Sequence, residues 1–405
     1  MPRFILLVVF MLSIGAQTVE APTWGFFGHR RINRLATFTL PPDMIRFYKK
    51  HIEFITEHAV DPDKRRYATK HEAVRHYIDI DHWGSYPFPE VPRNWTDVLA
   101  KYTELQVVSQ SGDTLVLTGA DHMFQDAGRW WYNKGPLKDA GVTVDVGDYN
   151  RFVQRQILPN YYEDAWPLSC DSLRQLFGLS AEFDCVSAHA VDQFSGYGIL
   201  PYHLLKMQRR LTDAFLEKDA EKILRLSAEF GHYLADAHVP LHTTENYNGQ
   251  LTGQDGIHGF WESRIPELYA DEDYDFFVGR AEYIDDPASY FWGIVLDSHQ
   301  LVDSVLSIEK ELSLTFPQDQ QYCYEDRLGV NIRTQCPEYA AAYQARLQGT
   351  IEARMRASIH AVGSAWFTAW VDAGSPKLDF GLVSEDIPEE ELKDTGNQLG
   401  RKHDN

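Results

Sequence analysis

Apolar residues recur at three- and four-residue steps through several long segments of the chain. In residues 44–57 the repeat is formed by Ile45, Tyr48, Ile52 and Ile55. This spacing places apolar side chains on one face of an α-helix. The same pattern predicts helices in residues 204–216, 220–237, 290–314 and 340–371. We therefore predict an all-α fold built as a multi-helix body.

Two segments depart from the helical pattern. Prolines open residues 83–147, and within them residues 113–118 and 142–146 have the alternating or β-branched positions of short strands. We expect loops and a hairpin there. Residues 376–405 contain many charged and few apolar residues, which predicts a flexible C-terminal tail.

The first residues of the chain have the pattern of an export signal. A single basic residue is followed by about thirteen apolar residues in positions 4–16, too few to span a bilayer as a helix but typical of a signal-peptide core. We predict a signal peptide in residues 1–23 and a secreted or periplasmic protein; an uncleaved membrane anchor is the alternative. Small residues between positions 15 and 23 offer several cleavage sites, so the true N-terminus stays open.

The four cysteines form two local pairs, Cys170 with Cys185 and Cys323 with Cys336. In an oxidising compartment this spacing predicts two disulfides, with free buried thiols as the alternative. None of the cysteines has the CxxC spacing of a thiolate zinc site, so a metal here would be held by histidines and carboxylates.

The chain is acidic, with a formal net charge of -21. This charge argues against a protein that holds a nucleic-acid duplex on a broad basic face. It does not exclude a nuclease, because bound divalent cations supply positive potential locally.

The strongest chemical signal is the sequence GHYLADAHVPLHTTENYNGQ followed by GIHGFWESRIPEL. His232 and Asp236 are four residues apart and share a helix face; His242 follows the end of that helix, and His258 and Glu262 repeat the four-residue pairing. A single such pair is more often a surface ion pair. Two pairs and a further histidine so close together favour a metal site, and imidazole with carboxylate is a ligand set that zinc accepts.

A second group of candidate ligands lies near the start of the chain. The sequence WGFFGH contains Trp24 and His29, and DPDKRRYATKHEAVRHYIDIDHWG contains Asp61 and His76. Together with the later motif, these segments resemble the superfamily of zinc-dependent phospholipases C and single-strand-specific nucleases of the S-one/P-one type. In that superfamily a processed N-terminal tryptophan binds metal through its α-amine and carbonyl oxygen.

The resemblance implies three zinc ions and a phospholipase C/nuclease-type helical bundle. It assigns nine metal ligands: Trp24, His29, Asp61, His76, His232, Asp236, His242, His258 and Glu262. In this assignment Asp236 bridges the zinc of Asp61 and His76 to the zinc of Trp24 and His29, and the last three residues hold the third zinc. Asp61 and Asp236, at the bridged pair, are the expected catalytic residues.

The family's chemistry implies hydrolysis of a phosphodiester by a metal-bound hydroxide, without a serine or cysteine nucleophile. Glu262 matches the phospholipases C, since the nucleases have Asp there, whereas WGxxGH and HYID resemble the nucleases. We expect a phospholipase C-like enzyme. A single-strand-specific nuclease or 3'-nucleotidase is the alternative, and a non-catalytic zinc-binding exoprotein is the alternative of another class.

The expected substrate is therefore a phospholipid, or a single-stranded nucleic acid or nucleotide. Transient contact with a membrane surface stays open, and no protein partner follows from the sequence. Lys64, Arg65 and Arg66 follow Asp61 closely enough to clamp a phosphate, although a solvated basic patch explains them equally well. Asp79 is expected to orient a ligand or contact substrate.

The resemblance also suggests how the chain is organised. We assign residues 24–375 to one phosphoesterase domain. The separation between the ligands at positions 76 and 232 is longer than in the family, so residues 83–201 are interpreted as an insertion of unknown role.

Overall fold

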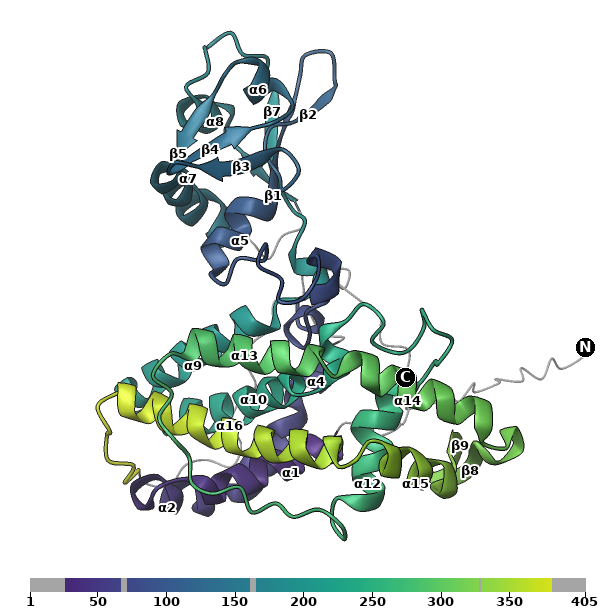
Figure 1. Cartoon of the computed structure of the whole chain (residues 1–405). Helices are drawn as coiled ribbons and strands as arrows, with labels where there is room; N and C mark the ends of the chain where they lie inside the picture. Colours follow the sequence, from purple (N-terminus) through teal and green to yellow (C-terminus); the bar gives the residue numbers. More distant parts are fainter. Residues whose placement is uncertain (1–25, 67–70, 161–164, 328, 381–405) are drawn as a thin grey trace, which may run out of the picture.

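The computed structural model of the protein describes residues 26–66, 71–160, 165–327 and 329–380. A helical body carries a smaller lobe of strands and short helices, which stands above it (Figure 1). The chain enters the lobe from the body and returns to it, so the body is assembled from segments on both sides of the lobe in the sequence.

The body consists mainly of helices that differ widely in length. Its α-helices are α1 (Phe26–Ala36), α2 (Pro42–Lys50), α3 (Ile52–Glu57), α4 (Asp61–Arg65), α9 (Leu200–Glu217), α10 (Ala220–Ala237), α11 (Ile257–Gly259), α12 (Ile265–Tyr269), α13 (Pro287–His299), α14 (Val302–Thr315), α15 (Pro337–Arg346) and α16 (Thr350–Asp372). A hairpin of β8 (Tyr322–Arg327) and β9 (Val330–Gln335) precedes α15.

The five predicted helical segments are confirmed, but three of them are divided. Helices α9 and α10 each form as one helix, whereas residues 44–57, 290–314 and 340–371 each contain parts of two. Between α15 and α16 the backbone φ is +51° at Gln348 and +78° at Gly349. Residues in this left-handed conformation end a helix. Two helices on either side of such a turn can share one continuous apolar pattern, so the pattern alone does not show where the first helix ends.

Close packing of α1 against α10 determines where the first ligand lies. The side-chain amide of Asn33 donates to the carbonyl of Ala228, at 2.9 Å. A Cβ on Gly231 would overlap the Asn33 side chain, so glycine is needed for this approach. His29 precedes Asn33 by about one helical turn and is thereby placed against His232.

In the part of the lobe that the structure describes, seven strands form two antiparallel sheets. The first sheet has the order β2-β1-β7-β6 and the second β3-β4-β5. Its elements are α5 (Trp95–Tyr102), β1 (Thr103–Val108), β2 (Thr114–Val116), β3 (Met123–Asp126), β4 (Arg129–Tyr132), α6 (Pro136–Asp139), β5 (Thr143–Asp145), α7 (Val146–Phe152), β6 (Ala165–Leu168), α8 (Cys170–Phe177) and β7 (Ser187–Asp192). Leu105, Trp130 and Trp166 belong to a hydrophobic core separate from that of the body.

The lobe corrects the predicted fold class. The chain is mainly helical, as expected, but two sheets in the lobe and the β8–β9 hairpin exclude a pure all-α class. Residues 113–118 and 142–146 do contain strands, β2 and β5. The pairing of β1 with β7 was missed because it is non-local: Thr103 lies opposite Asp192. The β8–β9 hairpin is local in the sequence and was not predicted either.

Both predicted disulfides are present. Cys170 of α8 is bonded to Cys185, and Cys323 of β8 is bonded to Cys336 at the start of α15. Disulfides persist in oxidising compartments, so the two bonds indicate a location outside the cytoplasm. The predicted signal peptide and most of the C-terminal tail fall outside the described residues.

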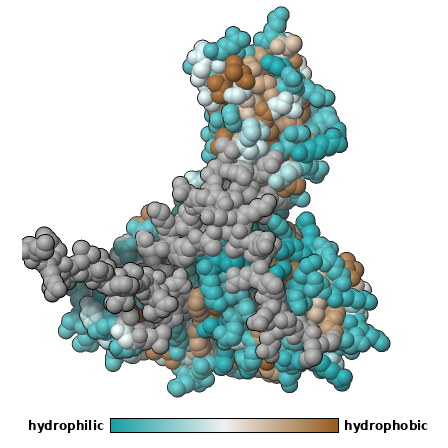
Figure 2. Space-filling view, turned by 180° about the vertical axis from the view of Figure 1, so that it is seen from behind, coloured by the Kyte–Doolittle hydropathy of each residue, from teal (hydrophilic) through white to brown (hydrophobic). Residues whose placement is uncertain are grey.

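Aromatic side chains join the lobe to the body. Trp83 stacks on Phe194 with ring centroids 4.9 Å apart and packs against Tyr102 at 4.5 Å. On the body side, the Tyr202 hydroxyl donates to the Pro92 carbonyl at 2.6 Å. Seen from behind, the surface of the lobe mixes apolar patches with hydrophilic residues (Figure 2).

Candidate metal centre

Helix α10 carries His232 and Asp236 on one face, both fully buried. The Nδ1–H of His232 donates to the carbonyl of Ala59 at 2.8 Å. This bond leaves the Nε2 lone pair directed at the carboxylate, 3.4 Å from Asp236 Oδ2. The helix therefore presents an imidazole nitrogen and a carboxylate to the same point.

His29 of α1 completes a first group with these two residues. Its ring stacks on that of His232 with centroids 3.9 Å apart, and its Nε2 lies 3.4 Å from Asp236 Oδ1. One donor atom from each of the three residues lies within 4.8 Å of the others. Trp24, the other ligand that the resemblance assigns here, lies outside the described residues.

A second group forms around His76, which follows the short turn of residues 73–75. Its Nδ1 lies 2.9 Å from Asp236 Oδ2 and 3.1 Å from His232 Nε2. Asp63 Oδ1 lies 3.8 Å from the same Nδ1 and 3.6 Å from His232 Nε2. The two oxygens of Asp236 thus face different groups, which is the arrangement of a bridging carboxylate.

The third group contains His242, His258 and Glu262. The two histidine Nε2 atoms lie 3.2 Å apart, and Glu262 Oε2 is 2.6 Å from that of His258 and 3.4 Å from that of His242. His242 donates its Nδ1–H to the His76 carbonyl at 2.5 Å, so its Nε2 points inward. Glu262 Oε1 lies 3.6 Å from His29 Nε2 and links this group to the first.

One assigned ligand, Asp61, does not join any of these groups. Asp61 and Asp63 both lie in α4, where residues two apart point about 200° from each other around the helix axis. Asp61 instead bonds to His58 Nδ1 at 2.5 Å and accepts from Lys64 Nζ at 2.8 Å. The structure therefore places Asp63 where the resemblance placed Asp61. Sequence spacing to His76 cannot distinguish Asp61 from Asp63, because the rotation of α4 determines which of the two carboxylates faces the groups.

The three basic residues after Asp61 have different surroundings. Lys64 is 46% exposed and pairs with Asp61, while the Arg65 side chain turns into the body, where its Nη1 lies 2.8 Å from Glu229 Oε1. Neither reaches the three groups, although both are predicted substrate contacts. Asp79, the third predicted contact, is buried, and its backbone N–H donates to the Tyr197 carbonyl at the base of the lobe.

Arg66 is the basic residue beside the candidate centre. Arg66 is 6% exposed, and its Nη1 lies 3.9 Å from Asp63 Oδ1. Within the described part of the chain, Nε and Nη2 have no hydrogen-bond partner. Unpaired guanidinium N–H groups next to metal-type donors favour a bound anion, and phosphate suits their geometry. From the sequence alone, Arg66 was one of three equivalent candidates for a phosphate contact.

The pKa shifts of His76, His232 and Glu262 fit metal binding, whereas burial raises the pKa of Asp63. Burial, with Arg66 and the neighbouring imidazoles, lowers the pKa of His76 well below its ordinary value, and burial with His29 does the same for His232. Burial raises the pKa of Glu262, but hydrogen bonds with His242, His258 and His29 outweigh it and hold this pKa well below the usual range. Neutral imidazoles and an ionised carboxylate are the forms that bind metals.

The chemistry of the donor set also calls for cations. Three carboxylates lie close together here: Asp236 is buried, and Asp63 and Glu262 are largely buried, so their negative charges are costly without nearby positive charge. Nitrogen and carboxylate donors without thiolates suit zinc. The residues present therefore fit the zinc ions that the resemblance implies.

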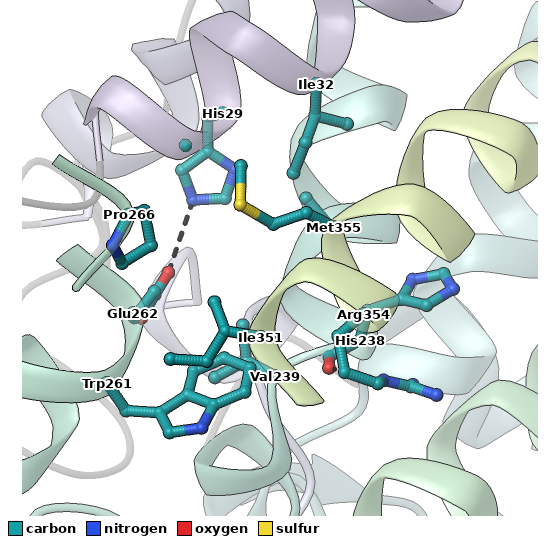
Figure 3. A pocket seen from close by; sticks show the side chains of 12 residues that line it. His29, Ile32, His238, Val239, Trp261, Glu262, Pro266, Ile351, Arg354 and Met355 are labelled. Atoms are coloured by element: carbon teal, nitrogen blue, oxygen red, sulfur yellow. Dashed lines mark hydrogen bonds and ion pairs between the residues drawn. The ribbon is translucent and has the colours of Figure 1, made fainter. Parts of the chain in front are cut away.

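A small cavity lies next to His29 and Glu262 (Figure 3). Its other walls come largely from apolar residues, among them Ile32, Trp261 and Met355. Its volume of about 30 Å³ is large enough to hold water. The cavity therefore borders the candidate centre at two of its ligands.

Comparison with known proteins leaves the family of this chain open. A scan against protein-family models finds no matching model, and a search of curated proteins finds no match. Among the described residues, no helix is both long and apolar enough to cross a membrane.

Proposed function

We propose that the protein is an exported zinc hydrolase that cleaves phosphodiesters, with phospholipids as the favoured substrate class. The observation that carries the proposal is the buried convergence of three His/carboxylate groups linked by Asp236 and Glu262. Structural zinc sites are normally closed and separate, so shared carboxylates support a catalytic cluster.

In this proposal some residues would hold the zinc ions and another would bind the substrate phosphate. His29, His76 and His232, with Asp63 and Asp236, would hold two neighbouring zinc ions, and the group of Glu262 would hold the third. Bound zinc supplies Lewis-acid chemistry, which activates water near neutral pH and neutralises phosphate charge.

Arg66 would recognise the substrate. Its unpaired N–H groups lie next to the carboxylate of Asp63 and can bind the non-bridging phosphate oxygens. Because the guanidinium is buried, it would keep its position when substrate leaves.

The choice of substrate rests on the third group. A glutamate at position 262 favours the phospholipase C branch of the resembled superfamily. The HYID sequence at positions 76–79 favours the nuclease branch, so single-stranded nucleic acid is the second candidate substrate. The two disulfides support the exported location, and removal of residues 1–23 would place Trp24 at the N-terminus.

The test uses the full chain expressed with its own leader in a secreting host. Mass spectrometry gives the mature N-terminus, elemental analysis gives zinc per chain, and hydrolysis is measured on phosphatidylcholine vesicles, single-stranded DNA and 3'-AMP. We expect about three zinc ions and chelator-sensitive hydrolysis of phosphatidylcholine. The variant Asp236→Asn should lose zinc from two groups, because its carboxylate contacts both.

The possible results separate the alternatives. Cleavage of DNA or 3'-AMP without phosphatidylcholine hydrolysis would make the enzyme a nuclease or nucleotidase. Three zinc ions without turnover on any of these substrates would favour the non-catalytic exoprotein. A chain that binds about one zinc, or activity that survives chelation, would refute the proposed centre.

A further inference from the structure

A buried glutamate lies behind one of the candidate zinc ligands. His76 directs Nδ1 toward Asp236 and His232, so its Nε2 points away from them on the opposite side of the ring. The nearest carboxylate oxygen recorded on that side is Glu72 Oε1, 3.9 Å from Nε2. Both side chains are fully buried, and Nε2 has no hydrogen-bond partner among the described residues.

Glu72 is fixed by groups from three elements. The Tyr233 hydroxyl, on α10 next to His232, donates to Oε1. Arg75 Nη1 donates to Oε2 at 2.7 Å, and Arg65 Nη2 lies 3.8 Å from Oε1. A carboxylate so constrained has a definite direction, and a shift of about 1 Å would bring it within hydrogen-bond distance of the imidazole.

We propose that Glu72 is a positioning residue that accepts the Nε2–H of His76 and so holds Nδ1 as the zinc-binding atom. An imidazole that binds metal through one nitrogen carries its proton on the other. A carboxylate acceptor for that proton selects the tautomer, fixes the ring orientation and makes the ligand more basic. This inference rests on the proposed zinc centre and concerns only the site formed with Asp63 and His232.

The surrounding contacts give Glu72 a role that its neighbours do not share. Glu229 is also buried and is bonded to Arg65, at 2.8 Å, but no contact with a candidate ligand histidine is recorded for it. It is therefore a matched control for the loss of a buried carboxylate from the same charged network. A change at Tyr233 tests the same role of Glu72 indirectly, because replacing Tyr233 by phenylalanine removes the hydroxyl that holds Glu72 and keeps the ring.

The experiment compares the mature wild-type chain with Glu72→Gln, Tyr233→Phe and Glu229→Gln. Zinc per chain is measured after dialysis against a graded series of chelator buffers. Long-range ¹H–¹⁵N spectra of the histidine rings report which nitrogen of His76 carries the proton. Thermal unfolding of each variant reports whether the fold is retained.

We expect Glu72→Gln to release one of three zinc ions at a chelator strength about 10- to 100-fold lower than wild type does. Tyr233→Phe should shift the same zinc by a smaller factor. Glu229→Gln should retain all three, and its His76 should keep the proton on Nε2.

Three outcomes overturn the inference. Wild-type zinc retention in Glu72→Gln with an unchanged His76 spectrum would show that Glu72 does not position the ligand. Equal zinc loss in Glu72→Gln and Glu229→Gln would assign the effect to the charged network as a whole. If Glu72→Gln does not fold, wild-type retention in Tyr233→Phe would refute the proposal. A wild-type chain that binds no zinc would instead refute the proposed function.

Discussion

Replacing Asp63 by asparagine should remove zinc from the group that contains His76 and leave the fold intact. The substitution keeps the size of the side chain but removes a negative charge 3.8 Å from His76 Nδ1 and 3.6 Å from His232 Nε2. Loss of an outer-sphere partner typically costs 10- to 100-fold in metal affinity. Loss of a direct carboxylate ligand should therefore cost at least about 100-fold, or about 2.8 kcal/mol.

Asp61→Asn is the matched control, because the two carboxylates lie two residues apart in the same helix. Asp61 bonds to His58 and Lys64 and not to any of the three groups. We expect this variant to keep wild-type zinc affinity and to lose about 1–2 kcal/mol of unfolding free energy, since a hydrogen bond to a charged group is weakened.

Zinc per chain after dialysis against chelator buffers distinguishes the two variants. Asp63→Asn should retain about two zinc ions under conditions in which Asp61→Asn and the wild type retain three. Circular dichroism should show the same helical content in all three proteins. The reasoning would be refuted if Asp61→Asn lost zinc while Asp63→Asn kept it, because Asp61 would then be the ligand, as the family spacing suggests.

Four further results are expected. Stripping zinc with a chelator at pH 7 should lower the Tm by about 10 °C, because ligands that bind only the native state stabilise it; an unchanged Tm would exclude structural coupling of the sites. Arg66→Met should lower kcat/KM about 100-fold or more with normal zinc content, whereas wild-type kinetics would remove this residue from substrate binding. In urea titrations, Gly198→Ala should destabilise the protein by about 2–4 kcal/mol, because φ at Gly198 is +91° and the new Cβ would overlap the Tyr77 carbonyl. The control Gly112→Ala, at φ +88° but in open space, should lose only about 1 kcal/mol, and equal losses in the two variants would contradict the overlap. Burial, with nearby cationic groups, holds the pKa of His203 well below 6.5, so His203 takes up a proton only on unfolding; the stability that its neutral form contributes is complete above about pH 6.5 and falls by about 1.4 kcal/mol per pH unit below it. Urea unfolding between pH 5 and 7 should therefore show a shallower pH dependence in His203→Gln than in the wild type, and equal slopes would refute this.

Local patterns determined much of the helical body and part of the site. Apolar periodicity located α10, which carries His232 and Asp236, but not α1 or α4, which carry His29 and Asp63. Four-residue spacing paired His232 with Asp236 and His258 with Glu262. These features depend on the geometry of one helix or a short segment, which neighbouring residues specify. The disulfide partners are equally local, since each pair closes a short loop.

Tertiary structure decided the features that depend on orientation and distant pairing. Strands β1 and β7 pair across the length of the lobe, so the sheet could not be read from either strand alone. Asp61 and Asp63 have the same chemistry, and the rotation of α4 against α10 determines which of them faces His232. Glu72 gains its proposed role only because folding places it behind His76. Sequence spacing records separation along the chain, whereas these choices depend on side-chain direction between elements packed together from distant parts of it.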